Sequence, residues 1–501
     1  MKKLDKSVLF IPIILIVCLS LFIAIFPSVS GNIINTIRDF LGNTIGVYYL
    51  IFGIAVLIVL GYLAFSKVGK IRLGSSSDKP MNTLTWGILI FTSTMAADIL
   101  FYSFHEWSYY YSNNVVAERA IQEEERLLWS STYPLFHWSF IPWAFYLVLA
   151  VIYAYMFFKA KRQDQQKISE ACRPLLGDKS DKWQGKTVNI VAMFGLLCGT
   201  STTFSVATPL LTAALCKLLN IQYSRIIAII MLFIIATIYT FAVLKKNGIS
   251  LIAKIAIILF SIFAALVFII GNPRFIIENG LQGIGNMLGN FVQLSTWTDP
   301  TRASCFPQDW TIFYWAYWIA WCVATPFFIA KISKGRTIKQ TVIGGLIAGL
   351  AGTFTSFIVF GGFGMNALTN GSFNMPELIA NGADPAQCIV ELISSTKIAP
   401  VLFVMLILTM IGLYASTFDA LTEVVSAFSY KRLSIDESPS KGIKIMWASI
   451  FILLPIALLF SESTTQQLMS MSIIGAFPLT IIMILVIISF FKDIKRKEKN
   501  K

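Results

Sequence analysis

Two stretches of the chain carry large aromatic side chains at helical spacing. The members that share one helical face are Tyr314, Tyr317, Trp318 and Trp321 in one stretch, and Trp138, Trp143 and Tyr146 in the other. A quaternary ammonium group has no hydrogen-bond donor and is held by the negative faces of such rings, each contributing about 0.5–2 kcal/mol. The spacing therefore predicts a site for an alkylammonium compound. The alternative is an aromatic belt at the membrane surface, where Trp and Tyr are also common.

Two carboxylates, Asp98 and Glu106, lie within a stretch that is otherwise apolar and aromatic. An ionisable group at membrane depth costs at least ~2.5 kcal/mol, so it usually faces a cavity. Asp98 lies half-way along its stretch and has no Lys or Arg within a turn. Three roles are open for Asp98: it binds and releases a proton, it balances the charge of a cationic substrate, or it forms a structural hydrogen bond to a neighbouring helix. Glu106 lies about 80° round the helix from Asp98, and a structural or a functional role is open.

Other polar groups point to an ion and not to catalysis. Adjacent hydroxyls at Ser416 and Thr417, close to Asp419, are oxygen ligands of the kind that Na⁺ prefers. His105 and His137 are the only histidines, and no further ligand lies at metal-site spacing, so we expect no metal. Neither a nucleophile with its base nor a phosphate loop is present, which argues against an enzyme, and no cofactor is expected beyond Na⁺ or H⁺ as a coupling ion.

These groups belong to a chain with the composition of a membrane protein. Of its 501 residues, 56% are apolar and only 13% are charged. Runs long enough to cross about 30 Å of hydrocarbon predict an all-α protein with twelve spans, near residues 7–29, 45–66, 84–111, 132–158, 187–217, 226–244, 249–270, 309–333, 337–362, 398–429, 442–460 and 468–491.

The net charge of +14 reflects topology. With a cytoplasmic N-terminus, 31 of the 40 Lys and Arg residues fall in inner segments and 8 in outer ones. This bias predicts that both termini are cytoplasmic, in a multi-pass protein of the cell membrane. Nucleic acid is not needed to explain the charge, so the bilayer is the expected surroundings.

The spans differ in content. The first two are plain aliphatic helices, whereas polar and aromatic groups concentrate in the other ten, the number that a five-plus-five inverted repeat needs. The expected divisions are peripheral spans in 1–66, a first repeat in 84–270, an external amphipathic segment in 271–308, a second repeat in 309–491, and a short basic tail in 492–501.

The chain resembles the betaine/choline/carnitine transporter family over most of residues 8–492. The most specific segment is Phe313–Trp318 (FYWAYW), followed by Ile332–Thr337 (ISKGRT). Further support comes from Leu135–Trp138 (LFHW) with Pro142 and Trp143, Ala207–Leu210 (ATPL), and Thr298–Pro300 (TDP).

This resemblance implies a LeuT-type fold of two inverted repeats, spans 3–7 and 8–12, preceded by two extra helices and assembled as a homotrimer. It also implies an aromatic box that closes on a trimethylammonium head. The residues that match the box are Trp138, Trp143, Tyr146 and Trp318, and Tyr317 and Trp321 match further aromatics of the substrate path.

Departures from the family pattern bear on coupling. Thr94–Asp98 replace a glycine-rich element, which predicts that span 3 lacks an easy backbone break. An aspartate at Asp98 is similar to the choline-transporting branch, whereas the general similarity is closer to the carnitine exchangers. Those sodium-independent exchangers use an arginine and a methionine where this chain has Ala256 and Thr325. Cation coupling is therefore favoured. The candidate coupling-ion residues are Thr92, Met95, Ser416 and Thr417.

The expected function is secondary active transport of a quaternary ammonium compound of the choline, carnitine or glycine betaine type by alternating access. The box would hold the methylated head, and Asp98 would neutralise that head or carry a proton. Two alternatives stay open: a sodium-independent exchanger of the carnitine type, and a membrane sensor that uses the same pocket without net flux. The sequence does not separate sodium, proton and exchange coupling.

Overall fold

The computed structural model describes residues 3–93, 96–119, 122–245, 247–461 and 465–499. In these residues the secondary structure is helical, with isolated β-bridges but no strand. The helices of the first half are α1 (Lys6–Ile25), α2 (Pro27–Asp39), α3 (Val47–Phe65), α4 (Thr83–Ser93), α5 (Ile99–Tyr111), α6 (Asn114–Arg119), α7 (Glu123–His137), α8 (Phe140–Ala154), α9 (Ile168–Ala171), α10 (Arg173–Leu176), α11 (Trp183–Leu219), α12 (Arg225–Leu244) and α13 (Gly248–Ile270).

The second half begins with two helices in the predicted external segment and continues to a long C-terminal helix. Its helices are α14 (Pro273–Gly289), α15 (Phe291–Thr296), α16 (Ile312–Trp321), α17 (Thr325–Ile332), α18 (Ile338–Ser356), α19 (Gly362–Thr369), α20 (Met375–Ala380), α21 (Pro385–Ser394), α22 (Ala399–Phe428), α23 (Lys441–Phe451), α24 (Leu453–Phe460) and α25 (Thr465–Lys499). Short π-helical turns extend several of them, among them η5 (Pro307–Thr311) before α16 and η6 (Phe357–Gly361) after α18.

Ten helices of the described residues are long and apolar enough to cross a membrane, and the bent pair formed by Pro307–Trp321 and Thr325–Ile332 makes eleven. The expected count of twelve is not reached by this measure. The reason is the predicted span 84–111, which is divided into the shorter helices α4 and α5.

Two of the spans are broken, and they lie five spans apart. In span 8, α16 ends at Trp321 and α17 leaves it at an angle of 56°, with Pro326 in the first turn of α17. In span 3, α4 ends at Ser93 and α5 begins at Ile99. The prediction that span 3 lacks an easy break was therefore wrong. Residues 96–98 are not helical although none of them is a glycine, and Asp98 precedes α5 without a side-chain capping bond, so a break here does not depend on glycine.

Helix pairings show the five-plus-five repeat that the spans predict. The two most extensive helix–helix contacts are between α11 of span 5 and α25 of span 12, and between α22 of span 10 and α13 of span 7. Moving each member by five spans converts the first pairing into the second. The same shift relates α8 with α17, of spans 4 and 8, to α18 with α4, of spans 9 and 3. The two halves are thus built alike around the broken helices.

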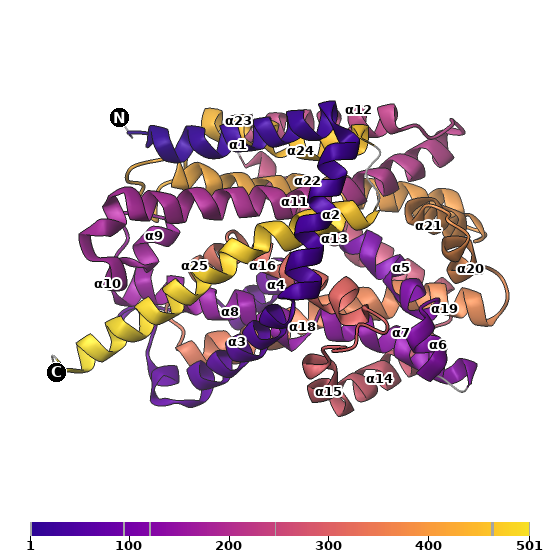
Figure 1. Ribbon diagram of the computed structural model, residues 1–501, viewed down its shortest axis with the longest axis horizontal. Helices are drawn as coiled ribbons and strands as arrows, with labels where there is room; N and C mark the ends of the chain where they lie inside the picture. The colour runs from indigo at the N-terminus through magenta and orange to yellow at the C-terminus, as the bar shows by residue number, and fades with distance from the viewer. Residues whose placement is uncertain (1–2, 94–95, 120–121, 246, 462–464, 500–501) are drawn as a thin grey trace.

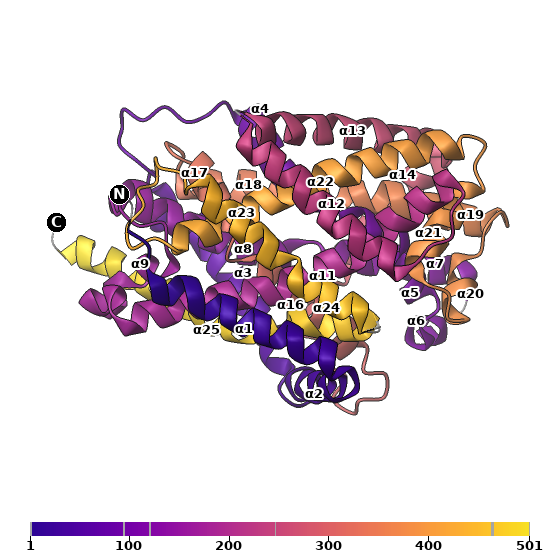
Figure 2. The same cartoon turned by 90° about the horizontal axis from the view of Figure 1, so that it is seen from above.

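The long helices run roughly side by side between two ends of the molecule (Figures 1 and 2). The N-terminus, the C-terminus and the short helix α9 lie at one end, and α6, α20 and α21 lie at the other. Between them α16 is enclosed: every residue from Ile312 to Trp321 is buried. The aromatic stripe predicted from the sequence is therefore in the protein interior and not on lipid.

The basic loop after α17 is tied to the segment before α4. Backbone bonds join Leu73 N to Arg336 O at 2.8 Å and Gly335 N to Leu73 O at 2.6 Å. Lys334 Nζ lies 3.0 Å from the Asp78 carboxylate, and the Arg336 guanidinium lies 4.1 Å from the centre of the Trp86 ring. These contacts of the basic loop thus hold the beginnings of spans 3 and 9 together.

Candidate functional site

The four aromatic residues predicted to form a box meet around Trp318 on α16. The Trp318 ring centre lies 4.7 Å from that of Tyr146, and 5.5 Å from those of Trp138 and Trp143. Tyr146 and Trp143 stand one turn apart on α8, and Trp138 follows the end of α7. The aromatic residues of the two stretches therefore form one cluster. The rings of Trp138 and Trp143 are edge-on to Trp318, and that of Tyr146 is tilted.

The rings of the box pack directly against one another between α8 and α16. On the far side of Trp143, α18 approaches closely because Gly349 has no side chain, and a Cβ there would lie 2.4 Å from the ring. The indole N–H groups of Trp143 and Trp318 have no hydrogen-bond partner within the described parts of the chain. A head group bound at the ring faces would therefore require Trp318 or a neighbour to move aside.

Asp98 is bound to the same helix as Trp318. It lies at the break in span 3, is 2% exposed, and accepts a hydrogen bond from the Tyr317 hydroxyl. The Tyr317 hydroxyl also meets Thr203 Oγ1 from α11. A buried carboxylate at the break in span 3 is thus bonded to α16 of span 8, and this arrangement fits either a counter-charge or a structural bond.

A cavity of about 330 Å³ lies beside these groups, between α4, α13, α17 and α22. Three of the predicted coupling-ion residues line it, Thr92, Ser416 and Thr417, together with Trp321 of the predicted substrate path. Met95, the fourth predicted coupling-ion residue, lies outside the described residues. Spans 3, 8 and 10 therefore contribute to a single space.

Two further sets of residues line the same cavity. One is the pair of positions where the sodium-independent exchangers differ from this chain, and the other is a group of charged side chains. Ala256 and Thr325 line the cavity. So do Asp419 and Glu423 of α22, which Lys444 of α23 reaches at 2.5 Å and 3.2 Å. Small and hydroxyl side chains thus give way to two acidic side chains, with Lys444 bonded to both and Lys331 of α17 also lining the cavity.

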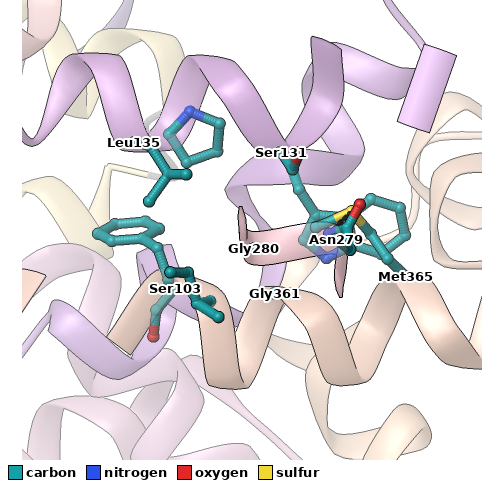
Figure 3. A pocket seen from close by; sticks show the side chains of 11 residues that line it. Ser103, Ser131, Leu135, Asn279, Gly280, Gly361 and Met365 are labelled. Carbon is teal, nitrogen blue, oxygen red and sulfur yellow. Dashed lines mark hydrogen bonds between the residues drawn. The ribbon is translucent and has the colours of Figure 1, made fainter. Parts of the chain in front are cut away.

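A second hollow, shown in Figure 3, lies where α5, α7, α14 and η6 meet. Ser103, Ser131, Leu135, Asn279 and Met365 surround it, and its volume is about 10 Å³. This space fits about one water molecule and is far too small for an alkylammonium compound. The 330 Å³ cavity is the better candidate for a substrate path.

Glu106, whose role the sequence left open, bonds directly to the box. Its Oε2 accepts from Trp138 Nε1 at 2.9 Å, and its Oε1 accepts from Tyr110 Oη at 2.7 Å. The row Asp98, Tyr102, Glu106 and Tyr110 has i, i+4 spacing, which places its members along one ridge of a helix. That spacing is the signal that could have joined Glu106 to the site.

The arrangement therefore assembles two groups from the predicted residues. Trp138, Trp143 and Tyr146 each contact Trp318, with Tyr317 and Asp98 bonded to each other beside them. Thr92, Ser416, Thr417 and Trp321 share the adjacent cavity. Such a site can hold a methylated cation against ring faces and can offer hydroxyl oxygens to a small ion.

Comparison with known proteins finds transporters. The model of a family described as betaine/carnitine/choline family transporters matches residues 7–499. A carnitine transporter of Acinetobacter baumannii is 27% identical over 92% of this chain and 84% of its own. The glycine betaine transporter OpuD of Bacillus subtilis is 27% identical over 100% of this chain and 96% of its own. The osmo-dependent choline transporter BetT2 of Acinetobacter baylyi is 25% identical over 99% of this chain and 72% of its own.

Proposed function

Since the chain belongs to the betaine/carnitine/choline transporter family, we propose that this membrane transporter carries a quaternary ammonium compound of the choline, carnitine or glycine betaine type by alternating access. The observation that carries the proposal is the buried cluster in which Trp138, Trp143 and Tyr146 all pack on Trp318. Four large aromatic rings in one place can bind, through their faces, an ammonium head that cannot donate a hydrogen bond.

The substrate site comprises the box, with Tyr317 and Asp98 beside it and Trp321 on the path to the cavity. In this account the rings are closed on each other, and substrate binding requires a rearrangement of α16 relative to α8. The bent junction between α16 and α17 supports such a movement, because broken helices are where transporters of inverted-repeat architecture bind substrate and ions.

Uptake is coupled to a cation. Thr92, Ser416 and Thr417 face one cavity, where their hydroxyl oxygens suit Na⁺. Ala256 and Thr325 line the same cavity and supply no positive charge at these two positions, although Lys331 of α17 lies elsewhere in its lining. Asp98 is the candidate group if the coupling ion is a proton. A sodium-independent exchanger of the carnitine type is the competing mode of transport.

The protein resides in the cell membrane with both termini in the cytoplasm. The common location of the two termini at one end supports this orientation, together with the excess of Lys and Arg in the segments assigned to that side. A homotrimer is the proposed assembly, as the family resemblance implies.

Uptake by the purified protein in liposomes tests the function. Labelled choline, carnitine and glycine betaine are each supplied with an inward Na⁺ gradient, with a proton gradient alone, or with unlabelled substrate inside. Accumulation driven by either ion gradient supports the proposal, and that gradient identifies the ion. Uptake that needs only internal substrate would make the protein an exchanger. Binding without any uptake would make it a sensor.

A further inference from the structure

A buried chain of hydrogen bonds leads from the box to the outer part of span 8. Trp138 Nε1 donates to Glu106 Oε2 at 2.9 Å, and Tyr110 Oη donates to Glu106 Oε1 at 2.7 Å. Tyr110 Oη also meets His137 Nδ1 at 2.8 Å, and His137 Nε2 meets Thr311 Oγ1 at 3.0 Å. Glu106 and His137 are 0% exposed and Thr311 is 2% exposed, so these bonds are shielded from bulk solvent.

With Glu106 ionised and the His137 imidazole neutral, each bond in this chain has a single direction. The single hydroxyl hydrogen of Tyr110 goes to Glu106, so His137 must donate from Nδ1 to the Tyr110 oxygen. His137 Nε2 is then an acceptor, and the Thr311 hydroxyl donates to it. All the hydrogens thus point towards the Glu106 carboxylate, which receives the two donors that a buried charge needs.

The Trp138 ring is held by aromatic packing and by one polar contact: it packs against Tyr102, Tyr314, Trp318 and Phe357. The residue stands between α7 and α8 with φ −113° and ψ 22°, so its backbone is outside both helices. Thr353 Oγ1 holds its carbonyl oxygen at 3.0 Å, but the indole ring has Glu106 as its polar anchor. The ring must nevertheless present a face next to Trp318, because cation–π attraction depends on the cation lying over the ring.

We propose that Glu106 is a positioning residue that orients the Trp138 indole for the ammonium head, and that Tyr110, His137 and Thr311 hold Glu106 in place. The role in binding rests on the proposed function. The chain joins spans 3, 4 and 8, so the box and the outer segment of span 8 are fixed to one another. Loss of the anchor lets the indole shift among the rings that pack on it and weakens binding of the head group.

Transport kinetics of paired variants test the proposal. Glu106→Gln keeps an oxygen that accepts from the indole, so its KM stays within about twofold of wild type. Glu106→Leu removes the acceptor, and its KM rises roughly tenfold, the factor expected from a lost bond to a charged group. In a Trp138→Phe background, which lacks the N–H, Glu106→Leu adds no more than about a twofold change. Glu278→Gln, an exposed carboxylate on α14, is the matched control and keeps the wild-type KM.

Tyr110→Phe keeps the indole bond and removes the next one, so its KM rises less than that of Glu106→Leu. This milder variant keeps the proposal testable if Glu106→Leu does not fold. An equal KM in wild type and Glu106→Leu would overturn the proposal. So would a Gln variant as impaired as the Leu variant, a full Leu effect in the Trp138→Phe background, or a wild-type KM in Tyr110→Phe.

A spectroscopic measurement separates this inference from the transport function. In protein labelled with 5-fluorotryptophan, the ¹⁹F resonance missing from Trp138→Phe belongs to Trp138. Glu106→Leu should shift or broaden that resonance, and Glu106→Gln should restore it towards the wild-type position. An unmoved resonance in Glu106→Leu would overturn the positioning role even if uptake is confirmed. A shifted resonance in a protein that transports none of the three compounds would instead refute the proposed function alone.

Discussion

The hydroxyl of Tyr317 on α16 donates a hydrogen bond to the Asp98 carboxylate at the break in span 3. This bond connects the first spans of the two repeats, from the break in span 3 to the middle of α16 in span 8. Thr203 of α11 meets the same hydroxyl, so three spans converge on one buried negative charge. Trp318 follows Tyr317 directly, and the carboxylate is therefore joined to the helix that carries the centre of the box.

Tyr317→Phe should weaken substrate binding while leaving the ring in place. Removing a donor from a buried carboxylate costs about 1–3 kcal/mol, and a head group that relies on this geometry should bind roughly tenfold more weakly. Binding of labelled choline to purified protein measures the effect. Phe313→Leu, on the same helix but without a hydroxyl, is the comparison for lost packing. An unchanged affinity in Tyr317→Phe would show that the bond is structural only.

Asp98→Asn should change the preference among substrates. Choline carries a net positive charge, whereas glycine betaine and carnitine also carry a carboxylate. Loss of the buried negative charge should therefore weaken competition by choline at least about tenfold more than competition by glycine betaine. Competition against one labelled substrate measures both in a single preparation. Equal losses for the two compounds would return Asp98 to a structural role.

Ser416→Ala combined with Thr417→Ala should impair ion coupling before it impairs substrate binding. Both residues line the 330 Å³ cavity, and Ser416 donates to Leu413 O while its oxygen stays available. If Na⁺ is the coupling ion, the Na⁺ concentration for half-maximal uptake should rise roughly tenfold. Ser261→Ala on the exposed face of α13 is the control. An unaltered Na⁺ dependence would place the ion elsewhere.

Asp78→Asn should lower thermal stability by the same amount from pH 8 to pH 5. Bonds from Ser75 and then Lys334 lower the pKa of Asp78 from 3.8 to about 2. Because the folded pKa is the lower one, the stabilisation is complete above pH 3.8 and is lost as the pH falls through about 2. Melting of wild type and variant across pH measures it. A difference that disappears between pH 8 and pH 5 would contradict this assignment.

The box is the part of the site that the sequence predicts best. Helical periodicity alone places Tyr317 and Trp318 on one face, and Trp143 and Tyr146 share a face for the same reason. The encounter between the two faces was implied by the family resemblance, and the ring contacts of Trp318 show that it occurs. The chemistry of individual helices is thus readable from spacing.

What the sequence does not predict depends on contacts between distant segments. The break before Asp98 was missed because its motif lacks glycine, yet α5 begins immediately after this residue. The bond between Glu106 and Trp138 depends on the rotation of α5 relative to α7, which no local pattern specifies. The helix-length measure does not confirm the predicted twelve spans, because it counts only long helices and span 3 is divided into the shorter helices α4 and α5.

Substitution of Trp318 tests the central claim most directly, because this ring contacts the other three of the box. Uptake of labelled choline, carnitine and glycine betaine is compared in liposomes containing wild type, Trp318→Phe or Trp318→Leu. An aromatic-box mechanism predicts that the Leu variant loses uptake and that the Phe variant retains a weaker, measurable affinity. Wild-type uptake and affinity in a folded Trp318→Leu protein would contradict it.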